Sequence, residues 1–515
     1  MMLSQSKTPP SRIIITSLLL SLTLSACTLG PDFKRPDPPN VSTYRQNKAT
    51  EQALVLGKEL PGQWWTLYHS KPLSALIAQA IKHNPDLQSA HATLVQAQEL
   101  AQAKKGSLLP SLDASAFSTR QQISGAQFGN PSMGGSVFSL YNTSVKVSYT
   151  LDVFGAIRRQ IENLSAQADY QRFQLEAAFL TIAANIVTTA LQEASLRAQI
   201  TATEQIIDAQ AQQLNVIQQQ FDLGSTSKAA VLAQQSTLAQ TRTYLPPLQQ
   251  ALAQTRHRLT TLVGTFPSTD LAAQFNLDEL SLPDALPLSL PAKLVEQRPD
   301  IRAQEAALHA ASAQIGVVTA SVFPDFTISS NVGSIATQAS GLFMPGSEIW
   351  NLTANLLQPV FHGGDFTHKR QAAVASYEQA AAQYRSTVLK AFQDVADTLS
   401  ALEFDENALK TQDAALQAAQ ESLSLTQTQF NIGAVSYVSL LNAQRDYQQA
   451  RMGRIKAQAA RLADTAALFQ ALGGGWWQRG NLSEVLTANQ KTQQVPCRFF
   501  DCWTNPLPTS LPAKD

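Results

Sequence analysis

Charge is scarce in this chain. Lys, Arg, Asp and Glu together make up 15% of its 515 residues, where about 25% is usual, and 38 basic residues balance 38 acidic ones. Because the formal net charge is zero, the composition offers no basic excess to attract nucleic acid, and we exclude a nucleic-acid partner. Ala and Gln are abundant instead, and Gly and Pro cluster between long runs, which favours an elongated, mainly helical molecule.

A long hydrophobic run is also missing near the N-terminus. The apolar stretch from Ile13 to Leu24 has about 12 residues, and about 20 are needed to span a bilayer as a helix, so we expect no transmembrane helix. Lys7 and Arg12 precede this stretch and Cys27 follows a small residue, which is the layout of a bacterial lipoprotein signal. The pattern predicts a signal peptide over residues 1–26 and a covalent lipid on Cys27; ordinary cleavage nearby is the alternative.

Cysteine is nearly absent, with three residues in the chain. With Cys27 assigned to lipid, Cys497 and Cys502 remain as a pair. An exported protein meets oxidising conditions, so we expect a disulfide between them, with two free thiols as the alternative. Thr28 follows Cys27 in place of the Asp that commonly keeps lipoproteins in the inner membrane, which favours the outer membrane as the destination.

The chain contains two copies of one large unit. Landmark residues recur at a spacing of about 210 residues, far longer than the spacing in solenoid repeats. The copies span residues 72–265 and 292–475, joined by a linker at 266–291; an extended N-terminal segment covers 27–71 and a C-terminal tail covers 476–515. The matching pairs are Pro85 with Pro299, Asp86 with Asp300, Pro110 with Pro324, Phe154 with Phe361, Phe221 with Phe430, Gly224 with Gly433 and Ser227 with Ser436.

Each copy contains one very long segment without proline, at 156–221 and at 364–430. In the first segment, mostly apolar residues from Leu175 to Phe221 follow alternating steps of four and three, which is the heptad pattern of packed helices. A helix of this length would span roughly 100 Å and would need partner helices. We expect return helices at 226–263 and 435–472, the first broken or kinked at Pro246 and Pro247, and shorter helices at 73–105 and 292–321.

Between the short and long helices of each copy, the pattern changes to period two, which predicts strands. Segments of about 9 to 11 residues with one apolar and one polar face have the length of tilted outer-membrane strands, although a half-buried soluble sheet is the alternative. The weakest candidate is 112–120. In the other three, the apolar positions are Val145, Val147, Tyr149 and Leu151; Phe326, Ile328 and Val332; and Trp350, Leu352, Ala354 and Leu356.

Four strands cannot close a sheet by themselves. A sheet that crosses lipid must close to satisfy its edges, and small barrels need about eight strands. At least two chains must therefore contribute, and three chains would make a wider twelve-stranded barrel with room for a water-filled lumen.

Short motifs in a fixed order complete the pattern and resemble the TolC-like outer-membrane efflux factors, in the lipoprotein branch that serves resistance-nodulation-division pumps. The resemblance covers nearly the whole chain from Cys27 to Trp476. It implies a homotrimer whose twelve-stranded barrel continues as a long helical tunnel into the periplasm, opened where the tip docks on a periplasmic adaptor. The motifs are Gly30-Pro31-Asp32-Phe33, Gln63-Trp64-Trp65, Asn84-Pro85-Asp86-Leu87, Leu109-Pro110, Leu151-Asp152-Val153-Phe154-Gly155, Arg298-Pro299-Asp300-Ile301, Phe323-Pro324 and Ala471-Leu472-Gly473-Gly474-Gly475-Trp476.

The resemblance also implies where the adaptor docks. The turns between long and return helices would meet it, with Phe221, Gly224 and Ser227 in the first copy and the matching residues in the second, Phe430, Gly433 and Ser436. A plain helix-turn-helix without docking function is the alternative. Family members often carry Arg-Tyr before the turn, where this chain has Gln-Phe, so the charge that the family presents to the adaptor at this position is missing here.

The periplasmic aperture departs from the family pattern. Relatives commonly carry acidic residues just after the second turn, and the matching positions here are Ser439 and Asn442. A carboxylate ring would bind cations and hold the gate through basic groups, and that ring is missing from the sequence. Arg445 and Asp446 remain as gate partners, with an exposed helical pair as the alternative.

One metal site can be imagined, because His362, Asp365 and His368 are spaced by three residues. His362 lies at a strand-to-helix junction, however, and no further ligand or activated base is evident. No nucleophile elbow or phosphate-binding glycine loop is found either. We therefore expect no enzyme, no metal and no cofactor beyond the lipid on Cys27.

These observations predict the outer-membrane exit duct of a tripartite efflux system, a passive channel for drugs or other small toxic compounds, with work supplied by an inner-membrane pump. A duct for secreted protein or peptide is the alternative. A purely structural coiled-coil lipoprotein is disfavoured by the period-two segments.

Overall fold

The computed structural model describes residues 28–44, 54–124, 126, 129, 135–283, 286–289 and 291–491. The signal peptide, Cys27, Cys497 and Cys502 lie outside the described residues. Contacts divide the chain into two compact units. The first contains the described residues up to Asp37, with Thr93–Arg172 and Ala303–Ser386; the second contains Pro38–Ala92, Phe173–Arg302 and the residues from Thr387 onward.

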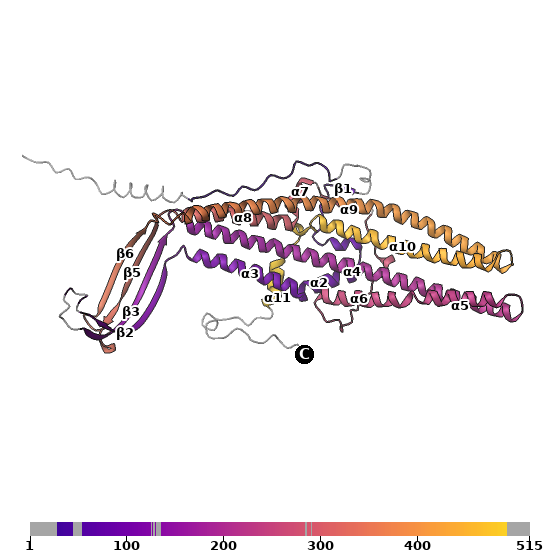
Figure 1. Cartoon of the computed structure of the whole chain (residues 1–515), viewed down its shortest axis with the longest axis horizontal. Coiled ribbons are helices and arrows are strands. Elements are labelled where there is room, and N and C mark those ends of the chain that lie inside the picture. Colours follow the sequence, from indigo (N-terminus) through magenta and orange to yellow (C-terminus); the bar gives the residue numbers. More distant parts are fainter. Residues whose placement is uncertain are drawn as a thin grey trace, which may run out of the picture. The chain divides into compact units, whose positions relative to one another are not determined.

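The first unit carries a four-stranded antiparallel sheet in the order β2-β3-β5-β6. Each repeat supplies one hairpin, and the hairpins meet where β3 pairs with β5 (Figure 1). All four strand predictions are confirmed, including the weakest, and most strands are longer than the alternating segments alone indicated. The bounds are β2 Ser111–Ile123, β3 Ser136–Leu151, β5 Asp325–Ala336 and β6 Glu348–Leu357.

The two long helices are α4, Ala156–Asp222, and α9, Asp365–Asn431, with 67 residues each. The heptad positions predicted in α4 are buried or half-buried throughout, so its seam packs against other helices. Among the described helices, α4 alone contains a window apolar enough to cross a membrane by composition, but 67% of that window is buried inside the protein. This burial identifies α4 as a packed helix.

The return helices differ between the two repeats. In the first, α5, Lys228–Arg242, ends just before α6, Leu245–Val263, begins with its two prolines in the first turn. Proline lacks an N–H and fits the first turn of a helix but not its interior, so the predicted break is confirmed. In the second repeat, α10 runs unbroken over Tyr437–Ala471.

The shorter helices correct one expectation. Residues 73–105 and 292–321 do not form single helices, because each is divided at an X-Pro step. The residue before proline is disfavoured in helical conformation, and proline starts a helix well. In the first repeat, Asn84 also caps the new helix through Oδ1, which accepts from Asp86 N and Leu87 N. The resulting helices are α2 Lys71–His83, α3 Pro85–Gly106, α7 Pro291–Gln297 and α8 Pro299–Ala320.

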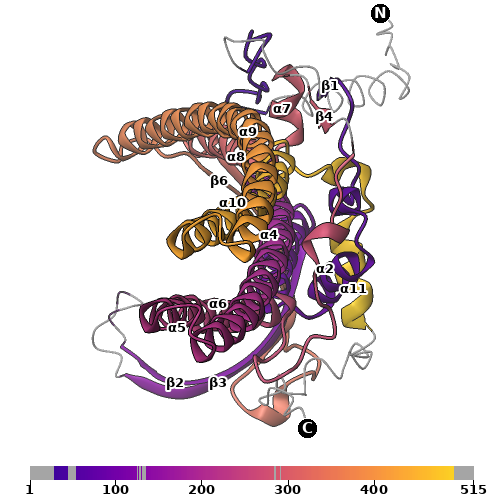
Figure 2. The same cartoon turned by 90° about the vertical axis from the view of Figure 1, so that its right-hand side faces the viewer.

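The N-terminal segment and the linker meet within the second unit. Strand β1, Leu54–Leu56, pairs in parallel with β4, Leu286–Leu288 (Figure 2). The 3-10 helix η3, Trp64–Tyr68, then buries Trp64 completely, so this end of the segment packs into the core and is not extended. The remaining described elements are η5 Leu277–Glu279, η6 Ala339–Gly341, η7 Trp476–Gln478 and α11 Leu482–Lys491, the last two in the predicted tail.

Candidate functional site

The first helical tip joins α4 to α5 through a glycine turn. Gly224 has φ +76°, its N–H donates to Phe221 O at 2.9 Å, and Ser225 N–H donates to Gln220 O at 2.8 Å. This pair of bonds is the Schellman motif, which satisfies the last carbonyls of a helix and requires a left-handed residue. Ser227 then caps α5 by accepting from Ala230 N at 3.3 Å.

The second tip repeats the same geometry between α9 and α10. Gly433 has φ +77°, with N–H bonds from Gly433 to Phe430 O at 2.9 Å and from Ala434 to Gln429 O at 2.8 Å. Ser436 caps α10 by accepting from Ser439 N at 3.3 Å. The predicted tip residues thus hold two copies of one rigid turn.

Each tip presents one apolar side chain to solvent directly before its glycine. Leu223 is 84% exposed and Ile432 is 75% exposed. The aromatic rings are partly covered, since Phe430 packs on Tyr437 with ring centroids 5.6 Å apart. Both residues lie in the turns that the sequence predicts, and their matched position before glycine in the two repeats is the signal in the sequence that singles them out.

The predicted aperture residues lie along the first turns of α10. Ser439 and Asn442 are exposed, and Ser439 Oγ lies 3.0 Å from Ser436 Oγ within the cap. Arg445 bonds Asp446, its chain neighbour, at 3.2 Å, with both side chains exposed. An exposed pair of this kind contributes about 0–1 kcal/mol. Ser439, Asn442 and Asp446 are spaced by three and four residues along α10, so they lie on one face of this helix.

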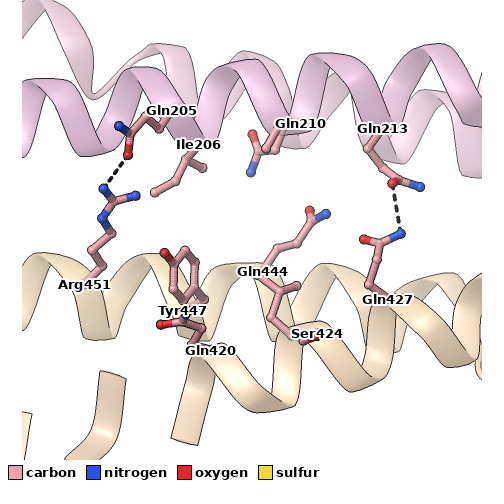
Figure 3. A pocket seen from close by; sticks show the side chains of 12 residues that line it. Gln205, Ile206, Gln210, Gln213, Gln420, Ser424, Gln427, Gln444, Tyr447 and Arg451 are labelled. Atoms are coloured by element: carbon pink, nitrogen blue, oxygen red, sulfur yellow. Dashed lines mark hydrogen bonds between the residues drawn. The ribbon is translucent and has the colours of Figure 1, made fainter. Parts of the chain in front are cut away.

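A cavity of about 430 Å³ lies behind the tips, between α4, α9 and α10 of the second unit (Figure 3). Six glutamines contribute to its walls. Gln427 Nε2 donates to Gln213 Oε1 at 3.2 Å, and Arg451 donates to Gln205, so side chains of the second repeat bond those of the first. The sequence does not indicate which residues make these contacts, although the abundance of Gln is visible in it.

A further amide contact lies closer to the second tip. The Tyr437 hydroxyl donates to Gln234 Oε1, and Gln234 donates onward to Gln210 O at 2.9 Å. Burial raises the pKa of Tyr437, so this phenol stays a neutral donor. Neutral groups therefore join the two repeats near the tips.

The sheet has one apolar face that is open to its surroundings. Leu112, Val147 and Leu352 lie in one row across the strands, as do Val145, Val332 and Trp350. Leu112 is 71% exposed and Trp350 78% exposed. A contiguous exposed apolar face of this kind marks an interaction surface, and its alternation with polar residues is that of a lipid-facing strand.

The residues that follow Cys27 are fixed at the junction between β3 and α4. Leu29 N–H donates to Phe154 O at 3.2 Å. Arg159, which is buried, donates to Leu29 O at 3.0 Å and to Asp32 Oδ1 at 2.8 Å. The segment therefore starts beside the end of the sheet.

The side chains of the candidate metal site, His362, Asp365 and His368, do not converge on one point. The ring of His362 packs on Phe366 with centroids 5.0 Å apart, and Asp365 pairs with Lys369 at 2.7 Å. Within the described part of the chain, no three His, Cys, Asp or Glu side chains converge as metal ligands.

The model of the outer membrane efflux protein family matches residues 76–265 and 290–474. The pyoverdine export outer membrane protein OpmQ of Pseudomonas aeruginosa is 30% identical over 421 residues, which cover 80% of this chain and 87% of OpmQ. The toluene efflux pump outer membrane protein TtgC of Pseudomonas putida is 28% identical over 477 residues, 90% of this chain and 97% of TtgC.

Solved structures agree with this assignment. The outer-membrane channel OprN superposes with a TM-score of 0.81 at 25% identity, covering 87% of this chain and 100% of OprN. The open state of the MtrE outer membrane channel of Neisseria gonorrhoeae superposes with a TM-score of 0.74 at 26% identity, covering 88% and 99%. The two matched family segments coincide with the two repeats, and the chain belongs to the outer membrane efflux protein family, as the outer-membrane exit duct of a tripartite efflux system.

Proposed function

We propose that three copies of the chain close one twelve-stranded barrel in the outer membrane. The support is the four-stranded sheet, whose outer strands β2 and β6 each have one partner within the described residues. In lipid, an unpaired strand edge costs several kcal/mol for each unsatisfied group, so the edges must pair with those of sister subunits. The apolar face would then contact lipid and the polar face would line the lumen.

We propose that Cys27 carries the covalent lipid. The hydrogen bonds of Leu29 and Arg159 hold the residues just after Cys27 beside the last residues of β3. A strand that crosses the membrane ends at its surface, so an acyl chain on Cys27 would enter the adjacent leaflet without strain on the protein.

We propose that the two tips dock on the helical hairpins of a periplasmic adaptor, and that an inner-membrane resistance-nodulation-division pump supplies the work. The exposed Leu223 and Ile432 offer matched apolar contacts on rigid turns. The members named here are channels and outer-membrane components of pumps, and we propose that this chain likewise conducts passively, without catalysis.

We propose that neutral contacts hold the closed aperture of this chain. Ser439 and Asn442 stand where relatives commonly carry acids, and bonds near the tips run between neutral Gln and Tyr side chains. A gate of this composition would respond weakly to divalent cations, because it offers them no carboxylate ring.

For cargo, we propose drugs or other small toxic organic compounds. OpmQ is named for pyoverdine export and TtgC for toluene efflux, and wide exit ducts discriminate little among small solutes. The observation that supports the proposed duct as a whole is the amphipathic sheet, which is joined in each repeat to a helix of 67 residues.

Two measurements test this function. The purified protein should conduct in planar bilayers and have three subunits by native mass spectrometry; a non-conducting monomer after proper reconstitution would contradict the duct. Deletion should raise susceptibility across a panel of hydrophobic drugs. Unchanged susceptibility with the loss of one secreted protein would favour a secretion duct instead.

A further inference from the structure

Two opposite charges face each other on the polar side of the sheet. Asp113 on β2 lies directly opposite Lys146 on β3, and both side chains are exposed. Directly opposed residues have Cβ atoms about 4.5–5.5 Å apart in an antiparallel pair. The same row continues through Asn331 on β5 to Asn351 on β6, so one polar row crosses all four strands.

The alternation of the strands fixes which face this row occupies. The neighbouring row on the opposite face contains Leu112, Val147 and Leu352, which are large and exposed. Successive side chains in a strand point to opposite faces. If the apolar face meets lipid, Asp113 and Lys146 must face the lumen.

Within the four described strands, the polar face carries a third charge, Asp325. It is the first residue of β5, about 20 Å along the strand from Asn331 at about 3.3 Å per residue. This separation exceeds the Debye length of about 10 Å at 0.1 M salt. The charges of the Asp113 row therefore act on ions independently of Asp325.

We propose that Asp113 and Lys146 form a charge-balanced ring that sets how weakly the barrel discriminates between cations and anions. The inference rests on the proposed trimer, in which three Asp113 carboxylates and three Lys146 ammonium groups alternate around one level of the lumen. Rings of charged side chains select ions by sign in wide channels. This ring is balanced, so it admits cargo of either charge.

The dimensions of the barrel permit this effect. Twelve strands about 4.8 Å apart and tilted by about 40° close at a backbone radius of about 12 Å. Side chains fill part of that radius, so the ring charges lie within about 10 Å of the axis, one Debye length at about 0.1 M salt. Their potential therefore reaches ions that cross the lumen.

The composition of the aperture makes the barrel ring more important for the ion selectivity of this chain. Ser439 and Asn442 place no carboxylate ring at the periplasmic end, and the exposed Arg445 and Asp446 cancel as neighbours. The aperture therefore adds no carboxylate ring that would mask an imbalance in the barrel row, and changing either residue of the row should unbalance the field.

Reversal potentials in planar bilayers under a KCl gradient near 0.1 M test the proposal. D113N leaves the lysines unbalanced and should shift the reversal potential toward that of chloride. K146Q leaves the carboxylates unbalanced and should shift it toward that of potassium. The double variant D113N/K146Q should restore the wild-type value, because both charges are removed.

Two charged residues on the apolar face of the same sheet serve as matched controls. Arg120 lies an even number of residues from Leu112 on β2, and Glu348 lies an even number from Trp350 on β6, so both are on the apolar face. R120Q and E348Q should therefore leave the reversal potential unchanged. A stabilising cross-strand pair without contact to the ion path would give no shift for D113N or K146Q either, so the readout separates the two roles.

A charge swap keeps the test decisive if a neutral variant fails to assemble. D113K should shift the reversal potential in the direction of D113N and further, and D113K/K146D should return it to the wild-type value. Conducting variants with wild-type reversal potentials would overturn the charge-balanced ring and leave the duct intact. Wild-type protein that does not conduct would contradict the duct itself.

Discussion

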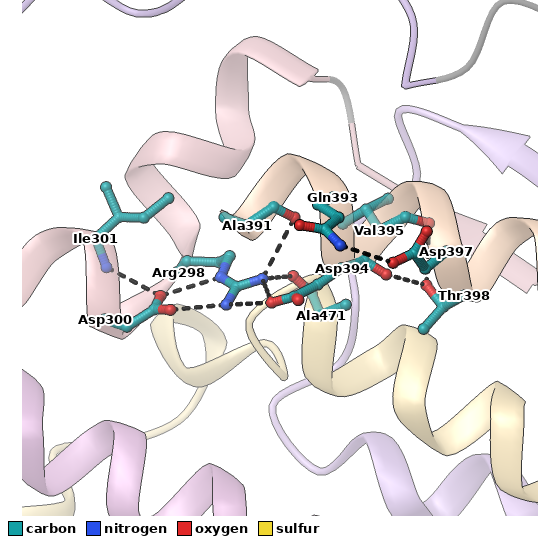
Figure 4. A network of polar contacts seen from close by, with 10 residues as sticks. All are labelled: Arg298, Asp300, Ile301, Ala391, Gln393, Asp394, Val395, Asp397, Thr398 and Ala471. Atoms are coloured by element: carbon teal, nitrogen blue, oxygen red, sulfur yellow. Dashed lines mark hydrogen bonds and ion pairs between the residues drawn. The ribbon is translucent and has the colours of Figure 1, made fainter. Parts of the chain in front are cut away.

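Arg298 donates from both Nη1 and Nη2 to Oδ2 of Asp394, each at 3.0 Å (Figure 4). The same guanidinium binds both carboxylate oxygens of Asp300, through Nε at 3.0 Å and Nη2 at 2.7 Å. It also donates to Ala471 O at 3.2 Å. One arginine, with its side chain only 11% exposed, thus joins the step before α8, the middle of α9 and the end of α10.

Replacing Arg298 should destabilise the second unit. R298M keeps the apolar stem but leaves Asp394 and the Ala471 carbonyl without this donor. Because Asp300 and Asp394 are more than a third exposed, solvent replaces part of the lost interaction, and the cost should be about 1–2 kcal/mol. Thermal unfolding of the detergent-solubilised protein, followed by circular dichroism, should show a clear fall in the melting temperature. R445M, which removes an exposed pair, is the control and should stay within about 0.5 kcal/mol of the parent. Equal melting temperatures for the two variants would contradict a structural role for Arg298.

The tip glycines should be essential to docking although they touch little. Gly433 has φ +77°, and an added Cβ there would meet no atom within 4 Å, so G433A acts through the backbone alone. Left-handed conformation costs a residue with a Cβ roughly 1–2 kcal/mol, enough to deform the turn. Capture by the adaptor should weaken and drug susceptibility should rise.

Gly106 supplies the matched control for the tip. It ends α3 without a positive φ and also has open space around it. G106A should therefore leave adaptor capture and susceptibility unchanged. If the adaptor captures correctly assembled G433A as well as it captures the wild type, the geometry of the turn is not what the adaptor recognises.

The sequence predicted most of this fold because its large-scale signals are strong. Proline-free segments, period-two segments and matched glycines led to the long helices, the strands and both tips. Two helices expected to be single are divided at Pro85 and Pro299. In the sequence, a proline that begins a new helix cannot be told from a proline inside a helix. The difference lies in the backbone conformation of the preceding residue, which only the structure gives.

The contacts between repeats could not be predicted in the same way. Gln213 of the first repeat meets Gln427 of the second only after distant helices have packed, and the same holds within the second repeat for Arg298 and Asp394. Nothing local marks either partner, because an amide or a guanidinium on a helix is compatible with solvent. The motif Arg298-Pro299-Asp300 was recognised as a landmark, and its structural role follows from the packing of α9 and α10 around it.

Acylation of Cys27 should be separable from membrane insertion. C27S removes the thiol that would carry the lipid, so intact mass spectrometry should show a mature N-terminus without acyl chains. The sheet should still insert, because its apolar face and not the lipid crosses the membrane, and the variant should remain in the outer-membrane fraction. Identical acyl mass in both proteins would place the lipid elsewhere.

The cysteine pair of the tail gives a simple mass test. Cys497 and Cys502 should be joined in protein exported to the periplasm, and a non-reducing digest should contain one crosslinked or internally closed peptide about 2 Da lighter than its reduced form. C497S should release Cys502 for alkylation. Complete alkylation of both cysteines in the native, unreduced protein would show free thiols.

Stability should depend on pH through Asp405 of α9. Burial raises its pKa from 3.8 to about 6, and a hydrogen bond with Asp464 and the charge of that carboxylate act in the same direction, while Arg461 opposes them. The folded protein therefore holds a proton that the unfolded chain releases, and stability falls as the pH rises from about 4 to about 6. A shift of this size in a partly exposed group is screened by solvent, so the effect should be on the order of 1 kcal/mol.

D405N should remove this pH dependence, matching the wild-type melting temperature near pH 4 and exceeding it at pH 7. D413N, on the same helix as Asp405, breaks an exposed pair with Arg454 of α10 and should follow the wild-type pH profile. Parallel profiles for D405N and wild type would rule out the protonated carboxyl.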